Sequence, residues 1–277
     1  SDDATWRLVQ DRPGLRYEVE PRPGLDFART RAVAAASGEL LAFLDDDVVV
    51  SPGWLRSLLE AWAENPDLGA LTGQVLPLAC ATEAQLLFER RGGFRRGFAK
   101  ARWGRECAAS AWFHPCNAGS FGAGCNMVFS ARLLRELGGF DEALDTGPPL
   151  PGGGDLDMFY RVIRAGRPLV YEPSMVVRHE HRREMAQVRR QYWSWGLGFM
   201  AFVAKCRRTD PALHKQQRRM IAWWFWKELR QVGASLRGRY PLPPSFALAE
   251  LWGSIAGLLG GYSRSERRIA RLRETSG

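Results

Sequence analysis

The sequence lacks a long apolar run and lacks the pattern of a secretory signal. A helix that spans a bilayer needs ~20 successive apolar residues, whereas the longest candidate, Phe246 to Gly261, is interrupted by Glu250 and rich in glycine. The first five residues, Ser1 to Thr5, are polar and show no basic start followed by an apolar stretch. We therefore expect a chain that lies on a membrane surface at most.

Cysteine is scarce and shows no metal-type spacing. The 277 residues contain five, at Cys80, Cys107, Cys116, Cys125 and Cys206. An odd number without paired spacing indicates reduced thiols rather than a disulfide framework. We therefore expect a cytoplasmic protein, with the inner face of the plasma membrane as its place of surface contact.

Acidic residues are depleted in the last third of the chain. Residues 178–277 carry 20 Lys/Arg against 7 Asp/Glu, whereas residues 1–177 carry 19 against 23. A composition of 45% hydrophobic and 25% charged residues excludes disordered and fibrous classes and suits one large domain with or without an appendage. The basic excess predicts an anionic partner, which from charge alone is a lipid surface, nucleic acid or a phosphate-bearing substrate.

Three successive aspartates, Asp45, Asp46 and Asp47, follow the apolar run Leu40 to Leu44. A run without polar alternation predicts a strand that is buried on both faces of an α/β sheet, and ligands of such sheets bind beyond the carboxyl ends of the strands. Mg²⁺ takes one or two carboxylates together with phosphate oxygens and water. The alternative is that the aspartates only favour the start of the next helix. Three in succession exceed that need, so we interpret them as a metal and ligand site.

A glycine run before Asp155 is the second signal. The glycines, Gly152 to Gly154, let the backbone approach a ligand closely, and Asp155 follows at the start of an expected helix. A carboxylate held there could act as a general base toward an acceptor hydroxyl. It could equally be a helix N-cap and no more. The motif alone leaves both interpretations open.

Two histidines, His179 and His181, follow the last expected strand, at residues 175–177. At positions i and i+2 of an extended segment both could ligate a metal, but histidines at a strand end also fill structural and surface roles. We favour His179 as the ligand.

The segments 187–205 and 215–236 are basic, tryptophan-bearing patterns that predict helices. Such helices fit an anionic membrane surface, where indoles lie at the headgroup level. They fit equally a helical pair that packs its aromatic side chains on a catalytic domain. We expect a catalytic domain over residues 1–181 and a helical, basic extension over residues 182–277.

Many motifs in order resemble those of the family 2 glycosyltransferases. They are Pro23-Gly24 with Ala28-Arg29, Gly38-Glu39, Phe43 to Asp47, Gly124-Cys125-Asn126, Gly138 to Glu142, Gly154 to Arg161, and Tyr171-Glu172-Pro173 with His179. The resemblance covers approximately residues 1–200 and is specific because the motifs occur in order at the right separations.

The resemblance implies a fold and an activity. The fold would be GT-A, a mixed but mostly parallel, Rossmann-like α/β sheet flanked by helices. The activity would be the transfer, with inversion, of a sugar from a nucleotide-diphosphate sugar to an acceptor hydroxyl, saccharide or lipid-linked, in the synthesis of cell-surface polysaccharide or glycolipid. Nucleic acid is then not an expected partner, and membrane contact would come through the C-terminal third.

The resemblance also implies roles for single residues. Asp155 would be the catalytic base. Asp45 and Asp47 would form the Asp-x-Asp pair, with Asp47 nearest to Mn²⁺ or Mg²⁺ and His179 as a further ligand. The donor site would be lined by Asp45, Asp46, Arg29 and Gly24.

The chain departs from the family pattern in places. The family usually has Glu-Asp where this chain has Gly154-Asp155, which removes a supporting carboxylate, and Thr30 stands where asparagine is usual. Ser1 to Thr5 resembles the segment that follows the second strand of family members. The resemblance therefore implies that a first strand-helix-strand unit, with much of the nucleoside pocket, is missing from this chain.

Two other classes of function remain open. A non-catalytic module that binds membrane or nucleic acid would need only the basic tail. A metal-dependent nucleotidyltransferase would also use paired aspartates, although the sequence shows no glycine-rich phosphate loop with a lysine.

Overall fold

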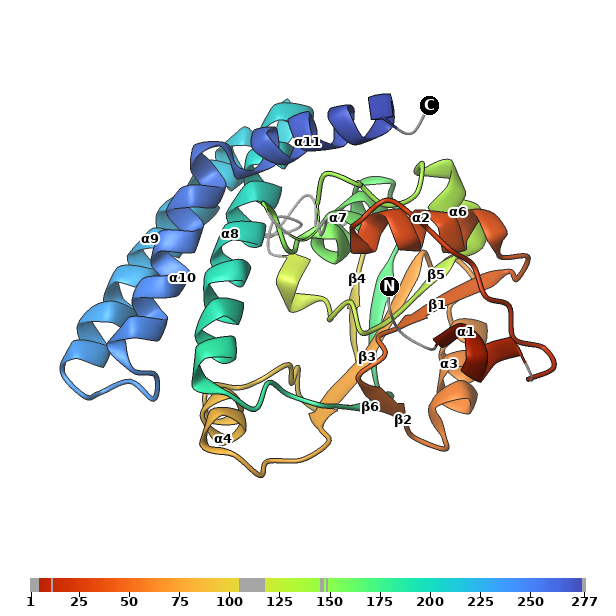
Figure 1. Ribbon diagram of the computed structural model, residues 1–277, viewed down its shortest axis with the longest axis horizontal. Coiled ribbons are helices and arrows are strands. Elements are labelled where there is room, and N and C mark those ends of the chain that lie inside the picture. The colour runs from red at the N-terminus through yellow and green to blue at the C-terminus, as the bar shows by residue number, and fades with distance from the viewer. Residues whose placement is uncertain (1–4, 11, 105–117, 145–146, 148, 276–277) are drawn as a thin grey trace.

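A computed structural model describes residues 5–10, 12–104, 118–144, 147 and 149–275. Its centre is a six-stranded sheet in the order β1-β5-β3-β6-β2, with β4 paired to β6 (Figure 1). The strands are β1 (Leu40–Leu44), β2 (Val48–Val50), β3 (Ala70–Pro77), β4 (Ala101–Trp103), β5 (Asn126–Ser130) and β6 (Leu169–His179).

The sheet is mixed but not mostly parallel, so that part of the expectation is wrong. Of the five pairings between described strands, only β3 with β6 is parallel. Among the described strands β1 lies at the edge of the sheet, with β5 as its one neighbour, rather than buried on both faces, and Leu44 at its end is 39% exposed. A strand at an edge leaves more of its surface uncovered than one between two neighbours.

Helices cover both faces of the sheet. Successive strand residues point to opposite faces, and both faces here carry apolar side chains that need a covering layer. Ala70, Phe129 and Leu169 lie in one hydrophobic cluster, whereas their neighbours in sequence lie in another. The second cluster includes Trp54 and Leu58 of α3. The helices of this part are α1 (Thr5–Gln10), α2 (Leu25–Ala35), α3 (Trp54–Ala63), α4 (Glu83–Arg90), α6 (Ala131–Glu136) and α7 (Gly154–Arg164).

Four further helices follow the sheet and form a layer beside it (Figure 1). They are α8 (Met185–Thr209), α9 (His214–Leu236), α10 (Pro244–Ala256) and α11 (Tyr262–Thr275), which confirms the helices predicted from the basic patterns. Phe199 and Phe202 of α8 belong to the same hydrophobic cluster as the sheet strands. The core therefore runs across the boundary predicted at residue 181.

Glycines allow α8 and α10 to touch through their backbones. A Cβ atom on Gly253 would overlap the carbonyl oxygen of Trp193, and one on Gly196 would lie 2.8 Å from Ser254 Oγ. Only glycine permits such an approach. None of the helices in the described part of the chain is long and apolar enough to span a membrane.

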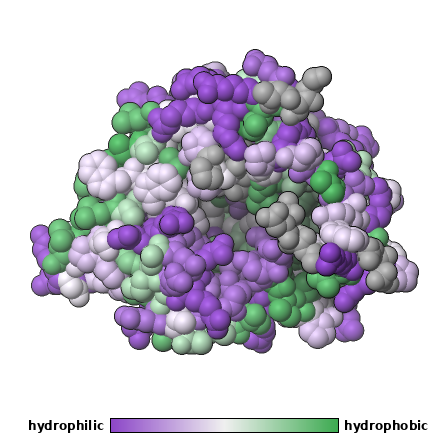
Figure 2. All heavy atoms as spheres, viewed as in Figure 1, coloured by the Kyte–Doolittle hydropathy of each residue, from purple (hydrophilic) through white to green (hydrophobic). Residues whose placement is uncertain are grey.

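α11 crosses the top of the molecule with one apolar and one basic side. Tyr262 and Ile269 are buried in a cluster with Leu197 of α8. The remainder of the helix is rich in arginine, and Figure 2 shows hydrophilic side chains gathered along this top edge. The helix is thus held by few apolar contacts.

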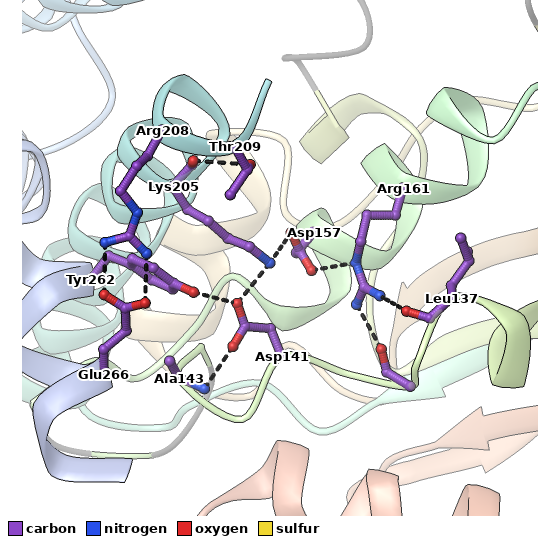
Figure 3. Close-up of polar contacts among 11 residues, drawn as sticks. Leu137, Asp141, Ala143, Asp157, Arg161, Lys205, Arg208, Thr209, Tyr262 and Glu266 are labelled. Atoms are coloured by element: carbon purple, nitrogen blue, oxygen red, sulfur yellow. Dashed lines mark hydrogen bonds and ion pairs between the residues drawn. The ribbon is translucent and has the colours of Figure 1, made fainter. Parts of the chain in front are cut away.

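A buried ion network joins the helical layer to the sheet domain (Figure 3). The Lys205 ammonium of α8 lies 2.6 Å from a carboxylate oxygen of Asp141 and 2.6 Å from one of Asp157. Arg161 pairs with the other oxygen of Asp157 at 2.7 Å, and the Tyr262 hydroxyl donates to Asp141 at 2.7 Å. Burial pushes the pKa of Asp141 upward, but Lys205 and Tyr262 outweigh it and hold the pKa below its usual range.

The pKa of a second buried carboxylate, Glu228 of α9, is shifted in the opposite direction to that of Asp141. Its side chain has no exposed surface, and Lys227 lies 2.9 Å from it. Burial, together with the negative charge of Glu250, raises the pKa of Glu228 to about 7 although Lys227 opposes this. The folded protein therefore binds a proton here that the unfolded chain has released, so stability falls as the pH rises from the unfolded pKa toward 7.

Glu228→Gln should raise the thermal midpoint at pH 8 and change it little at pH 5. The gain at pH 8 should be on the order of 3 kcal/mol, because the ionised form is then no longer buried. Thermal unfolding across this pH range measures it. Glu274→Gln, at an exposed glutamate of α11, is the control and should show no such pH dependence. An equal effect of Glu228→Gln at both pH values would contradict the prediction.

Candidate active site

The aspartate triplet lies in the turn between β1 and β2, at the end of the edge strand. Asp45 and Asp47 are partly buried, whereas Asp46 is exposed. Burial raises the pKa of Asp45; Arg29 opposes the rise, while Asp47, Asp155 and Asp46 add to it. The predicted base and the triplet therefore share one electrostatic site, although they are far apart in the sequence.

Asp155 is held in the first turn of α7 by the glycines around it. Gly153, in the left-handed region at φ 113°, is the N-cap of the helix, so Asp155 is not the cap. Its Oδ2 accepts a hydrogen bond from the Gly124 amide at 3.0 Å. A Cβ atom on Gly124 would lie 3.2 Å from that oxygen and 3.1 Å from Arg29 Nη2. The glycine of the Gly-Cys-Asn motif thus leaves room for both groups.

Arg29 of α2 lies between carboxylates. Its Nη1 pairs with Asp26 Oδ1 at 3.1 Å, and its Nη2 lies 3.9 Å from Asp45 Oδ1. The side chain is 7% exposed. Gly24, at φ 147°, precedes α2 and sets the start of the helix that carries Arg29 and Asp26. Gly24 therefore affects the site by setting where α2, with Asp26 and Arg29, begins.

Asp47 faces His179, as the sequence predicts for a pair of metal ligands. Asp47 Oδ1 is buried, makes no hydrogen bond within the described part of the chain, and lies 3.4 Å from His179 Nε2. The β2–β6 pairing fixes this register, because it sets Val48 opposite His179. An orphaned carboxylate oxygen beside an imidazole nitrogen fits a divalent cation.

Asp47 and His179 together suit a cation that takes few ligands from the protein. Within the described residues no group of three or more His, Cys, Asp and Glu side chains is arranged to hold a metal. Mg²⁺ and similar cations in phosphate sites take one or two carboxylates and complete their shell with phosphate and water. Asp47 and His179 fit this type of site, with Asp45 nearer to Arg29.

His179 is oriented by a chain of hydrogen bonds that runs to α4. Its Nδ1 lies 3.1 Å from His181 Nδ1, and His181 Nε2 lies 2.9 Å from Glu89 Oε1. Burial lowers the pKa of His179, although Asp47 opposes this, so its ring is neutral at pH 7. A carboxylate only accepts, so His181 donates through Nε2. A neutral His181 then accepts at Nδ1. His179 then carries its proton on Nδ1 and presents a lone pair at Nε2 toward Asp47.

Glu89→Gln should weaken binding of Mn²⁺ by about 10- to 100-fold, since second-shell acceptors fix the tautomer of a metal-binding histidine. A glutamine can donate to His181 and so favour the wrong tautomer. Calorimetric titration with Mn²⁺ measures the effect without turnover. Glu83→Gln, at an exposed residue of the same helix, should bind Mn²⁺ as the wild type does. Equal affinity in both variants would contradict the tautomer argument.

Several residues of the site carry no sequence signal that would single them out. Asp26 and Glu89 lie among other charged residues, and Arg96 lies in a basic stretch without clear periodicity. The Arg96 guanidinium donates to the Gly119 carbonyl at 2.8 Å. Burial lowers its pKa, against the attraction of Tyr171 and Asp155. Cys125 is buried beneath the carboxylates, and burial raises its pKa, so it is a neutral thiol.

Comparison with known proteins identifies the family. The family described as "Glycosyl transferase family 2" matches residues 1–138, which include the triplet and Arg29. The chain belongs to this family. The match ends before Asp155 and His179, so their assignment in this family 2 chain depends on the geometry described above.

Curated relatives of this family 2 chain are longer proteins. A pre-mycofactocin glycosyltransferase of Mycobacterium tuberculosis is 29% identical over 158 residues, which cover 57% of this chain and 30% of that protein. A glucosyl-dolichyl phosphate glucuronosyltransferase of Haloferax volcanii is 24% identical over 127 residues, 43% of this chain and 34% of that protein. The chain spans about a third of the length of these relatives.

Among solved structures, the mannosyltransferase PcManGT from Pyrobaculum calidifontis, in complex with GDP-Man and Mn²⁺, is similar in fold. The TM-score is 0.54 at 16% sequence identity, over 93% of this chain and 72% of that one. The family 2 chain thus has the GT-A fold that its sequence predicts.

Proposed function

We propose that this chain carries the catalytic residues of an inverting, metal-dependent glycosyltransferase. One observation carries the proposal: Asp155, Arg29 and Asp45 lie within one electrostatic site, while Asp47 of the same turn faces His179. A base and a cation site are the two groups that direct displacement from a nucleotide-diphosphate sugar needs. The similar mannosyltransferase was solved with such a donor and Mn²⁺.

The residues would divide the reaction between them. Asp47 and His179 hold the cation, and Asp45, fixed by Arg29, faces the donor. A divalent cation bound there offsets the negative charge that develops on the leaving diphosphate. Asp155 removes the proton of the acceptor hydroxyl as its oxygen attacks the anomeric carbon on the face opposite to the diphosphate. The acceptor is a hydroxyl of a saccharide or of a lipid-linked group.

Thermal shift of the full-length protein against UDP-, dTDP- and GDP-sugars tests the donor. With Mn²⁺, one class should raise the midpoint by roughly 5 °C when present at about 100 times its Kd. The shift should disappear with EDTA and in Asp47→Asn. Release of a nucleoside diphosphate identifies sugar transfer, whereas release of pyrophosphate would identify a nucleotidyltransferase. Absence of a shift with every sugar nucleotide would contradict the proposal.

We also propose that the outer face of α9 binds an anionic bilayer surface. Its exposed apolar side chains are Trp226 (53%), Leu229 (60%) and Leu236 (68%). The exposed basic residues around them are Lys215, Arg218, Arg219, Arg230 and Arg237, and the one acidic residue of the helix, Glu228, is buried. Arginine and tryptophan on one exposed helix face match anionic headgroups above acyl chains.

Co-sedimentation with vesicles tests this face. Vesicles rich in phosphatidylglycerol should bind the protein, and phosphatidylcholine vesicles should not. Trp226→Ser with Leu229→Ser should release it. Leu55→Ser with Leu59→Ser, at exposed positions of α3, should bind as the wild type does. Binding that both double variants retain equally, or equal affinity for DNA, would contradict a lipid-specific face.

A further inference from the structure

The start of α7 contains a carboxylate that comes from another helix. Gly154, the first residue of α7, has no side chain, and Asp26 of α2 fills its place. A Cβ atom on Gly154 would overlap Asp26 Oδ2 and lie 2.7 Å from Oδ1. The Asp26 side chain has no exposed surface. The position before the base Asp155 therefore holds a carboxylate although its own residue is glycine.

Asp26 also fixes the arginine of the site. Its Oδ1 accepts a hydrogen bond from Arg29 Nη1 at 3.1 Å. With Nη1 held in this way, Arg29 Nη2 lies 3.9 Å from Asp45 Oδ1. The same Nη2 and Asp155 Oδ2 both lie near Gly124, 3.1 and 3.2 Å from where its Cβ would be. The guanidinium thus lies near three carboxylates, and its distance to Asp26, 3.1 Å, is shorter than that to Asp45, 3.9 Å.

This sharing matters because guanidinium and carboxylate prefer a bidentate pair. Without Asp26, Arg29 would lose its partner at 3.1 Å and could pair with Asp45 or Asp155 through both nitrogens. A base in a close ion pair has a weaker hold on a proton, and its oxygens are no longer available to an acceptor hydroxyl. Asp26 prevents this by occupying one side of the guanidinium.

We propose that Asp26 is a positioning residue of the transfer reaction: it supplies from α2 the carboxylate that α7 lacks beside Asp155, and it holds Arg29 between Asp45 and Asp155. The proposal rests on the proposed function, since it assigns Asp155 as the base. If the proposal is correct, a carboxylate attached to residue 154 should support kcat in place of the one on residue 26.

The geometry allows that transfer. Asp26 Cγ lies 2.6 Å from the position of a Cβ on residue 154. An aspartate at 154 has its carboxyl carbon one bond, ~1.5 Å, from that Cβ, so in the best rotamer this carbon comes within ~1.1 Å of the present one. Such a residue fits only when residue 26 has given up its own carboxylate, because both would otherwise occupy the same volume.

A double-mutant cycle tests the proposal on the protein with its donor, acceptor and Mn²⁺. Asp26→Ala should lower kcat by about 10²-fold with little change in donor KM, the loss expected of a group that orients a base. Gly154→Asp alone should be unstable and inactive, because it forces two carboxylates together. Asp26→Ala with Gly154→Asp should recover at least ten times the kcat of Asp26→Ala.

Further variants separate position from stability. Asp26→Asn keeps the shape but removes the charge that pairs with the buried Arg29, so it should lower both kcat and the thermal midpoint. A double variant that recovers the midpoint but not kcat would overturn the positioning role, as would full activity of Asp26→Asn. If the wild type transfers no sugar, the proposed function fails, and this proposal with it. If the wild type is active and no rescue occurs, only this proposal fails.

Discussion

Asp155→Asn should abolish sugar transfer and leave donor binding nearly intact. A general base contributes about 10²- to 10⁴-fold to such a reaction, and asparagine cannot accept the proton of the acceptor hydroxyl. The amide oxygen can still accept the hydrogen bond that Gly124 donates at 3.0 Å, so the local structure should persist. Initial rates with a saturating donor measure the loss, and calorimetry measures donor affinity.

The control for this variant is Asp67→Asn, at a carboxylate that pairs with Arg102 on the surface, 56% exposed. It should transfer sugar as the wild type does. Undiminished transfer by Asp155→Asn would remove Asp155 from the mechanism. Loss of donor affinity together with rate would show instead that the residue acts on binding of the donor.

Lys205→Met should destabilise the folded chain by about 3–5 kcal/mol, the cost of removing one partner from a buried ion pair. The change leaves Asp141 without its cation, and Asp157 with Arg161 alone. Lys205 is 11% exposed and Asp157 1% exposed, so water cannot replace the ammonium. Urea unfolding at pH 7 measures the loss, and adding Asp141→Asn should recover part of it.

The pH dependence of this effect has a definite sign. The pKa of Asp141 is lowered in the folded state, so its ion pair contributes stability above the unfolded pKa and loses it as the pH falls through the folded value. The difference between wild type and Lys205→Met should therefore shrink in acid. Lys100→Met removes a 45% exposed lysine that also contacts two carboxylates and should cost at most ~1 kcal/mol. Equal losses for both lysines would contradict the argument from burial.

Short motifs and local periodicity were enough to predict residues that the structure brings together at the candidate active site. The run at 40–44 is a strand and the triplet follows it directly, as expected, whereas His179, expected after the last strand, is the final residue of β6. Glycine, aspartate and histidine at these places have backbone or chemical properties that other residues lack, so the sequence shows them. The roles of Asp155, Asp47 and His179 remain predictions until the variants are measured.

The arrangement of strands could not be predicted in the same way. An apolar run indicates burial but not direction, and β5 lies antiparallel between β1 and β3. The strand expected at 175–177 is part of the longer β6, which begins at Leu169. The pairing of β6 with β3 shifts register after Gly73, where residues 173–175 of β6 are passed over. Proline donates no ladder hydrogen bond, so Pro173 argues against one continuous strand in the sequence.

Residues that act on the site through another residue could not be predicted from the sequence. Glu89 reaches His179 through His181, and Asp26 reaches the candidate active site through Arg29 and through the space that Gly154 leaves for its carboxylate. Both depend on distances between helices and strands that are remote in the chain. No local pattern records such distances.

Because the Asp26 carboxylate lies where a side chain of residue 154 would be, substitutions at residues 26 and 154 are coupled in evolution. A descendant sequence can gain a side chain at residue 154 only after residue 26 has shortened, since one volume serves both. A chimera that takes only α2 or only α7 from a protein with a carboxylate at residue 154 would carry two carboxylates at this point or none. Both segments must be exchanged together to keep a single carboxylate there.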